Sequence, residues 1–250
     1  MENKKEKALV KQDINFLEYP NWALSRWGGR KEIVIKKEKG LYKFRTANDR
    51  LPDRVDKTIL YYLIRSLGEK NFNRRKIKTT RYRMTEDIFG GRSQYGYKRV
   101  IEGLERWTDV SVSFEGIFYK GDGYTTRIFH IIDNVKLNKK TGELTINLDD
   151  YYLEWLKASQ YYRMIDYKEF RKFKKDISAR LYEIFKAQPL PWKIEARNLA
   201  EKLTLGQKYP SYIVRKVEQG IKELNKKTDL KIKFSHDKNE RKETICVFSL

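Results

Sequence analysis

A run of basic residues between positions 70 and 83 is the clearest chemical signal in the sequence. Seven Lys and Arg side chains lie in this run, and no acidic residue interrupts them. They are Lys70, Arg74, Arg75, Lys76, Lys78, Arg81 and Arg83. Cationic side chains at this density suit the phosphates of a nucleic-acid backbone. We therefore predict phosphate contacts from this stretch.

Two predicted helices carry side chains that can contact base edges. Arg and Gln are suitable because they bind guanine or adenine through two hydrogen bonds. The candidates in the first half are Gln94, Tyr95, Lys98 and Arg99, beside Glu102. Those in the second half are Tyr212, Arg215, Lys216, Gln219 and Lys222, with Arg241 in the polar loop 235–243. Any single one of them fits a merely solvated helix face equally well.

Residue patterns that support catalysis are missing from the sequence. His130 and His236 stand apart, so they form no His-hydrophobic-His pair for a metal. The segment GGRSQYGYKR lacks the spacing of a phosphate-binding P-loop. Asp149 and Asp150 are better explained as the cap of a helix than as metal ligands. We expect no metal, no cofactor and no catalytic site.

Tyrosine pairs leave one enzymatic alternative open. They occur at 61–62, 151–152 and 161–162, and a tyrosine hydroxyl can attack a phosphodiester, as in a nickase. Tyrosine at helical spacing is more often a residue of an amphipathic core.

Charge and composition point to a polyanionic partner. The 55 Lys and Arg against 34 Asp and Glu give a formal charge of +21, which favours nucleic acid. A membrane partner is disfavoured, because the sequence has no long apolar span and no separate basic amphipathic tail. One cysteine, Cys246, and an N-terminus without an apolar leader lead us to expect a reducing, cytoplasmic location.

The first half contains the elements that would position its candidate contacts. Apolar spacing predicts a helix over 52–67, a short helix after a Thr85 cap, and a third helix after Ser93. The expected stripe of the third helix is Tyr97, Ile101, Leu104 and Trp107. Alternating residues then predict a hairpin from Val110, through the turn 120–123, to 132.

The second half repeats this order. Helices are predicted over 177–188, over 194–206 and after a Ser211 cap, followed by strands 230–234 and 244–250. The same Thr-Asp pair follows the apolar stripe of each predicted third helix, 120 residues apart, at Thr108–Asp109 and at Thr228–Asp229. Helix, short helix, helix and hairpin is the order of a winged helix, a helix-turn-helix variant. We therefore predict an α+β fold of two tandem winged-helix domains in pseudo-repeat.

Four segments follow from this division. We expect a flexible tail over 1–15 and a first winged-helix domain over 16–148, with extra N-terminal strands and a turn at Gly28 and Gly29. A packed connecting helix over 149–165 follows, preceded by a hairpin around Thr141 and Gly142 that we assign to the connection. The second winged-helix domain is expected over 166–250. The connection is rich in aromatic residues, which is atypical of a flexible tether.

The second half resembles the plasmid replication initiator (Rep) proteins, theta-type initiators that bind iterons. The segments that carry the resemblance are ISARLYEIF from Ile177 and VEQGIKELNKKTDLKIKF from Val217. YPNWALSRWGGR and the segment 53–67 resemble, more loosely, the replication initiator protein A group. The resemblance extends from about Tyr19 onward.

The resemblance implies two winged helices that bind repeated double-stranded DNA sites at an origin and open an adjacent AT-rich segment. It further implies recruitment of the host initiator and helicase-loading machinery, homodimers as well as monomers, and no catalytic site. Two alternatives stay open: a rolling-circle-type nickase with a tyrosine nucleophile, and a winged-helix transcriptional repressor.

Overall fold

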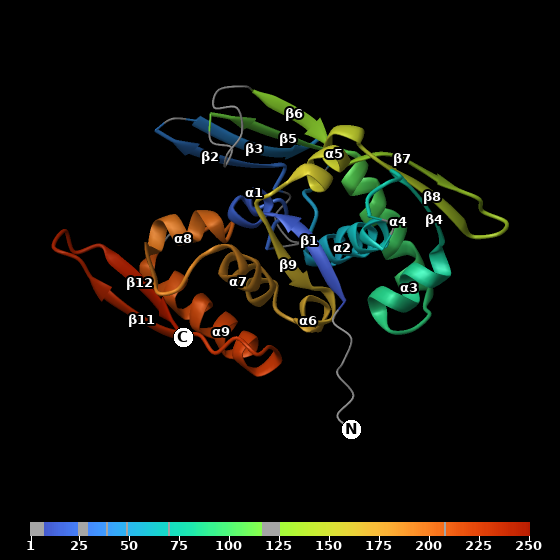
Figure 1. Ribbon diagram of the computed structural model, residues 1–250. Helices are drawn as coiled ribbons and strands as arrows, with labels where there is room; N and C mark the ends of the chain where they lie inside the picture. The colour runs from blue at the N-terminus through green and yellow to red at the C-terminus, as the bar shows by residue number, and fades with distance from the viewer. Residues whose placement is uncertain are drawn as a thin grey trace.

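Two winged-helix units in tandem form the body of the protein (Figure 1). This computed structural model describes residues 8–24, 30–38, 40–48, 50–69, 71–116, 126–207 and 209–250. The first unit consists of α2 (Arg54–Gly68), β4 (Lys76–Thr80), α3 (Arg81–Phe89), α4 (Gln94–Thr108), β7 (Ile132–Leu137) and β8 (Glu143–Leu148). The second consists of α7 (Asp176–Ala187), β10 (Trp192–Glu195), α8 (Ala196–Lys202), α9 (Pro210–Lys227), β11 (Lys233–Lys238) and β12 (Thr244–Ser249). Their sheets have equivalent strand orders, β4-β8-β7 and β10-β12-β11, which confirms the predicted fold class.

The third helix of each unit is formed largely as the sequence predicts. Ser93 caps α4, since its side chain accepts a hydrogen bond from the backbone of Gly96. The stripe of α9 is buried as expected, at Val217, Ile221 and Leu224. In α4 the buried apolar residues are Val100, Leu104 and Trp107, whereas Tyr97 and Ile101 are half-buried. The prediction was therefore correct for Leu104 and Trp107, whereas Val100 is buried in place of Tyr97 and Ile101.

Several helices begin at other residues than predicted. Thr80, not Thr85, caps α3: its hydroxyl accepts from the backbone of Arg83, while Thr85 is buried within the helix. Arg81 and Arg83 consequently lie in the first turn of α3. Likewise α9 begins at Pro210, which suits a first turn, and Ser211 lies inside the helix. The helix α8 begins at Ala196, because the residues before it form β10.

The wing of the first unit is not the hairpin that follows α4. Strand β5 (Val110–Glu115) pairs with β3 (Gly40–Thr46) and β6 (Arg127–His130), and β3 pairs with β2 (Glu32–Lys37). These four strands form a separate sheet. The turns expected at 120–123 and at Gly28 and Gly29 lie outside the described residues.

The wing of the first unit is the β7–β8 hairpin. The sequence analysis had assigned this hairpin to the connection between the units. Its turn contains Gly142 with φ +73°, and β8 pairs with β4 along its other edge. Strand β4 was missed because Ile77 is its single buried residue among basic and hydroxyl side chains. In Figure 1 the two wings project at opposite ends of the molecule.

The segment 8–15 is folded, which corrects the predicted tail. Strand β1 (Leu9–Asp13) pairs with β9 (Tyr162–Asp166), and α1 (Ile14–Glu18) follows it. Val10 and Gln12 are completely buried. The pairing with β9 also corrects the connection: its helix α5 (Asp150–Ala158) stops early, and β9 and α6 (Tyr167–Lys172) follow. Ser159, just beyond α5, donates a 2.5 Å hydrogen bond to Asp13.

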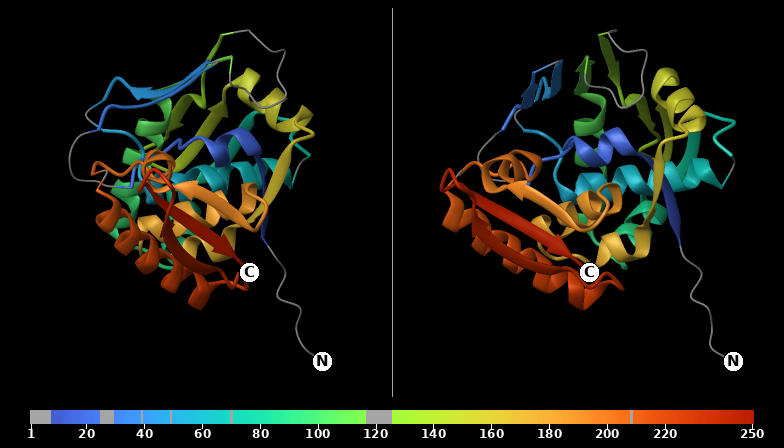
Figure 2. Two further views of the ribbon diagram at one scale, coloured as in Figure 1. Left: turned by 90° about the vertical axis from the view of Figure 1, so that its left-hand side faces the viewer. Right: turned by 60° about the vertical axis from the view of Figure 1, so that its left-hand side comes forward.

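The connection and the four-stranded sheet share one aromatic core. Phe16 of α1 packs against Phe114 and Phe129 of the sheet and against Tyr152 and Trp155 of α5, with ring centroids 5.1–6.2 Å apart. Helix α7 of the second unit packs against α1, and Figure 2 shows the second unit beside the helices of the first unit. The two units therefore form one packed body.

Within the described part of the chain, every helix is too short or too polar to traverse a lipid bilayer. The same residues contain no group of three or more His, Cys, Asp or Glu side chains arranged to hold a metal ion.

Candidate nucleic-acid interface

The outer face of α4 carries three of the four candidates predicted on it. Gln94 and Lys98 are exposed, and Tyr95 is 58% exposed. Lys98 lies 3.8 Å from Glu102 on the same face, an exposed pair that contributes little to stability. All three side chains are accessible to a DNA groove.

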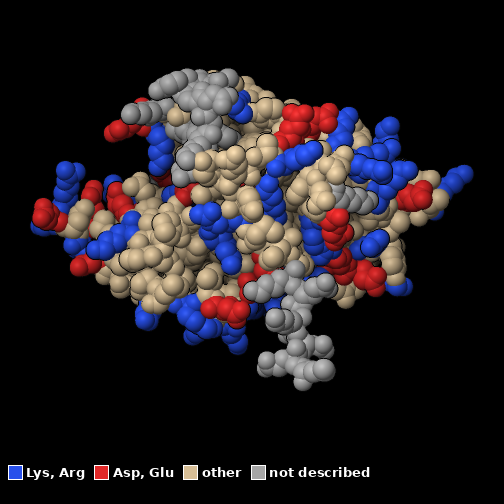
Figure 3. All heavy atoms as spheres, viewed as in Figure 1, with Lys and Arg blue, Asp and Glu red and all other residues tan. Residues whose placement is uncertain are grey.

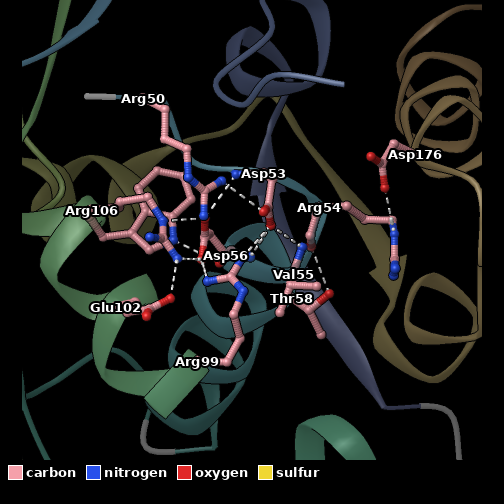
Figure 4. Close-up of polar contacts among 11 residues, drawn as sticks. Arg50, Asp53, Arg54, Val55, Asp56, Thr58, Arg99, Glu102, Arg106 and Asp176 are labelled. Carbon is pink, nitrogen blue, oxygen red and sulfur yellow. Dashed lines mark hydrogen bonds and ion pairs between the residues drawn. The ribbon is translucent and has the colours of Figure 1, made fainter. Parts of the chain in front are cut away.

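Arg99 is the fourth candidate, and the structure excludes it from this surface. Its side chain is 3% exposed and lies between α4 and α2 (Figure 4). One guanidinium nitrogen donates to Asp53 at 2.6 Å and another to Asp56 at 2.5 Å. A guanidinium held by two buried carboxylates is not available to DNA, so the prediction for Arg99 was wrong.

Arg106 joins the same buried cluster and was missed by the sequence analysis. Its guanidinium donates to the two carboxylate oxygens of Asp56 at 2.8 and 3.1 Å. Gly103 allows the close approach of α4 to α2, because a Cβ there would clash with Ile59 and lie 2.6 Å from Asp56. The seven-residue spacing of Arg99 and Arg106 was the available signal, since it places both on one helix face. The cluster holds α4 on α2 in one position.

The basic residues predicted over 70–83 lie on several different surfaces, and Lys70 is outside the described residues. Lys76 and Lys78 point away from the core on β4, whereas Ile77 between them is buried. Arg74 and Arg83 are exposed. Arg75 is held by Asp133 at 2.9 Å and by Asp150 at 2.8 Å, which compensates its charge.

Arg81 lies where α3, α4 and the first wing meet. Its backbone N–H donates to the carbonyl of Gly142 at the wing turn, and its guanidinium lies 5.9 Å from the ring centre of Tyr97. A hollow of about 250 Å³ opens here, lined by Arg81, Tyr97 and the wing residues Lys140 and Thr141. Lys140 was not predicted as a contact, because its hairpin had been assigned to the connection.

The second unit has an equivalent but larger groove. It measures about 930 Å³ and lies between the N-terminal half of α9 and the β11–β12 wing. Arg215 lines it from α9, and His236, Lys238 and Lys242 line it from the wing. Arg241 is exposed in the turn of the same wing. Figure 3 shows Lys and Arg side chains at both ends of the molecule, where the two wings lie.

The remaining candidates of α9 lie beside this groove. Gln219 and Lys222 are exposed, while Tyr212 and Lys216 are half-buried. Tyr212, Lys216 and Gln219 line a second hollow, of about 450 Å³, on the side of α7. Cations of Arg215 and Lys216 lie 5.8 and 5.5 Å from the Tyr212 ring centre, which limits the freedom of all three side chains.

Each unit thus presents an exposed third helix beside a basic wing, the two parts of a winged helix that enter DNA grooves. The side chains differ between the units: Gln94, Tyr95 and Lys98 on α4, against Arg215, Gln219 and Lys222 on α9. The two surfaces therefore suit different base sequences.

Comparison with solved structures reveals relatives of the whole arrangement. A crystal structure of domains 2 and 3 of RctB matches with a TM-score of 0.60 at 11% identity, covering 95% of this chain and 98% of that one. A crystal structure of the Pi initiator protein in complex with iteron DNA matches with a TM-score of 0.59 at 16% identity, covering 78% and 89%. At these identities the likeness concerns the fold. A search of the curated proteins gives no match by sequence.

A family model gives the assignment. The model described as "Initiator Replication protein, WH1" matches residues 35–186, which is more than half of the chain. The match falls largely on the first unit, and it confirms the predicted resemblance to replication initiator proteins. The chain belongs to the initiator replication protein family.

Proposed function

We propose that this replication initiator binds directly repeated double-stranded DNA sites at an origin, with one chain on each repeat. Bound chains would promote opening of an adjacent AT-rich segment and recruit the host initiator and helicase-loading machinery. The observation that carries the proposal is the presence of two unlike winged helices in one packed chain, each with an exposed third helix and a basic wing. The Pi initiator, which shares the fold, was crystallised in complex with iteron DNA.

Two unlike units favour an asymmetric site. A symmetric dimer of single units matches an inverted repeat, whereas α4 and α9 of one chain present different side chains to successive groove faces. If both helices enter the same face of the duplex, their contacts lie about one helical turn, ~34 Å, apart. Repeats of such a site lie head to tail, in direct orientation.

The proposed action involves no catalysis by this chain. The Tyr61 and Tyr152 hydroxyls are fully buried, and burial raises the pKa of both, so neither is placed to attack a phosphodiester. Tyr151 and Tyr162 are 37% and 41% exposed, on the surface of α5 and on β9. With chromosomal or plasmid DNA as its ligand, the protein would act in the cytoplasm.

Footprinting on the DNA that flanks the protein's own gene tests the proposal. Protection of several direct repeats is the expected result, and protection of a single palindrome would favour the repressor instead. The same preparation, incubated with supercoiled plasmid and Mg²⁺, should leave the plasmid closed. Nicking or covalent attachment to DNA would establish the nickase alternative.

A further inference from the structure

We propose that a buried polar cluster fixes the distance and the rotation between α4 and α9, and thereby sets the spacing of the two half-sites in the DNA. The cluster, which we call the Glu183 lock, consists of Trp22, Lys57, Tyr61, Arg180 and Glu183. The part of the inference that concerns DNA rests on the proposed function. The part that concerns the orientation of the two units does not.

The carboxylate of Glu183 is the centre of the lock. Its Oε1 accepts a 2.5 Å hydrogen bond from the Tyr61 hydroxyl and lies 3.7 Å from Nζ of Lys57. Its Oε2 accepts from the Trp22 indole at 2.8 Å and from the Arg180 guanidinium at 3.0 Å. All five side chains are completely shielded from solvent.

The lock joins the first helices of the two units. Lys57 and Tyr61 belong to α2, and Arg180 and Glu183 belong to α7. A second link lies nearer the start of both helices, where Arg54 of α2 pairs with Asp176 of α7 at 2.9 Å. Positions 54 and 61 are two helical turns apart, roughly 10 Å. Attachment at two separated points restricts both the separation and the angle of α2 and α7.

Each first helix also holds its own DNA-reading helix. In the first unit, Asp56 of α2 binds Arg99 and Arg106 of α4. In the second, the Glu223 carboxylate of α9 accepts hydrogen bonds from the backbone N–H groups of Lys174 and Lys175, at the start of α7. The helices α4 and α2 pack together, as do α7 and α9, and the side-chain links between α2 and α7 connect the two pairs.

Because the lock is polar, we infer that it fixes the orientation of the two units and adds little to the stability of the protein. Burying Glu183 with Arg180 and Lys57 carries a desolvation cost that apolar side chains of the same volume would avoid. Directional hydrogen bonds, in contrast, are satisfied in few relative positions of two helices. A lock of this kind selects one arrangement of the units over others with similar apolar packing.

Fixed units make DNA binding sensitive to half-site spacing. Each base pair inserted between the half-sites moves one of them by about 3.4 Å and rotates it by about 35°. A rigid protein must then give up base contacts of one unit, whereas loosely joined units can follow the DNA.

The first experiment measures the lock without DNA. Spin labels at Glu105→Cys on α4 and Lys226→Cys on α9, both exposed, report the distance between the helices by pulsed electron paramagnetic resonance. We expect one narrow distance distribution, broadened or shifted in the variant Arg54→Ala/Tyr61→Phe. This variant removes the Arg54–Asp176 pair and the Tyr61–Glu183 hydrogen bond, and leaves the 3.7 Å contact of Lys57 with Glu183 between α2 and α7. The matched control Arg50→Ala/Tyr62→Phe makes the same changes at contacts within the first unit, to Asp53 and Thr79. An unchanged distribution in Arg54→Ala/Tyr61→Phe would overturn the lock.

The second experiment measures spacing preference on the footprinted repeat. One inserted base pair should weaken binding of the wild type and the control about tenfold or more, because at least one base can no longer be reached. For Arg54→Ala/Tyr61→Phe the same insertion should change affinity by less than about threefold. An equal spacing penalty in all three proteins would refute the role of the lock in DNA spacing. If no direct repeat is bound at all, the proposed function is refuted. The distance measurement then still tests whether the Glu183 lock fixes the orientation of the two units.

Discussion

Replacement of Asp56 by Asn tests the buried cluster that holds α4. Asp56 is completely buried and accepts hydrogen bonds from Arg99, Arg106 and the backbone N–H of Asp53. The amide keeps the shape but loses the charge and one acceptor, so two guanidinium groups lose their shared counterion. Removal of one partner from a buried ion pair costs about 3–5 kcal/mol. The free energy of unfolding of a domain is about 5–15 kcal/mol. The variant Asp56→Asn should therefore still fold, but with a strongly reduced free energy of unfolding.

Urea denaturation followed by tryptophan fluorescence measures this loss. Trp107 reports directly on the cluster, because its indole N–H donates to the carbonyl of Asp56 at 2.7 Å. The expected loss corresponds to a decrease in Tm of roughly 6–20 °C for a protein of this size. Asp133→Asn is the matched control: its carboxylate pairs with Arg75 at the surface and should contribute less than about 1 kcal/mol. An equal, small loss in both variants would refute the structural role of Asp56.

Four further predictions concern DNA contacts and buried titratable groups. Lys76→Ala/Lys78→Ala should weaken binding to specific and random DNA alike, and lower the slope of the salt dependence by about 0.9 for each phosphate that the variant no longer neutralises. Arg215→Ala should instead cost roughly 1–3 kcal/mol at one base position, and equal losses on specific and random DNA would contradict its assignment as a base contact. Burial lowers the pKa of Lys57 in the folded protein to about 8. Between this pH and the higher pKa that Lys57 has in the unfolded chain, the unfolded chain binds more protons than the folded protein. The free energy of unfolding of the wild type relative to Lys57→Met should therefore rise by roughly 2–3 kcal/mol from pH 8 to 10.5, and a flat difference in urea titrations would contradict this. Burial raises the pKa of the Cys246 thiol to about 11, so iodoacetamide at pH 8 should modify the native protein slowly and the unfolded protein rapidly.

A matched control separates phosphate contacts from net charge. Lys36→Ala/Lys37→Ala removes the same charge from exposed positions of β2, a strand of the four-stranded sheet that includes neither wing. Its effect on DNA affinity should be smaller than that of Lys76→Ala/Lys78→Ala. Equal effects would show that the β4 lysines act only through the total charge.

Local signals in the sequence were sufficient for the helices that carry the candidate contacts. The Ser93 cap and the apolar spacing of α4 and α9 depend on residues close in sequence, so these helices could be predicted nearly to their ends. The recurrence of Thr108–Asp109 at Thr228–Asp229 marks the end of the third helix in both units.

The predictions that failed concern residues whose partners lie far away in the sequence. The first wing was misassigned because β4 finds its partner β8 more than sixty residues later, across an inserted sheet. Arg99 was predicted to be exposed because its acceptors, Asp53 and Asp56, lie 46 and 43 residues away, at the start of another helix. The partners of Glu183 in the lock lie up to 161 residues away, and no local pattern distinguishes Glu183 from a solvated helix residue.

The stoichiometry and footprint of the complex on a single repeat test the central claim most directly. Native mass measurement should find one chain on one repeat, and hydroxyl-radical footprinting should show two protected regions about one helical turn, roughly 10 base pairs, apart on one face of the duplex. Two chains bound symmetrically to a palindromic site, each protecting the same half-site sequence, would contradict it.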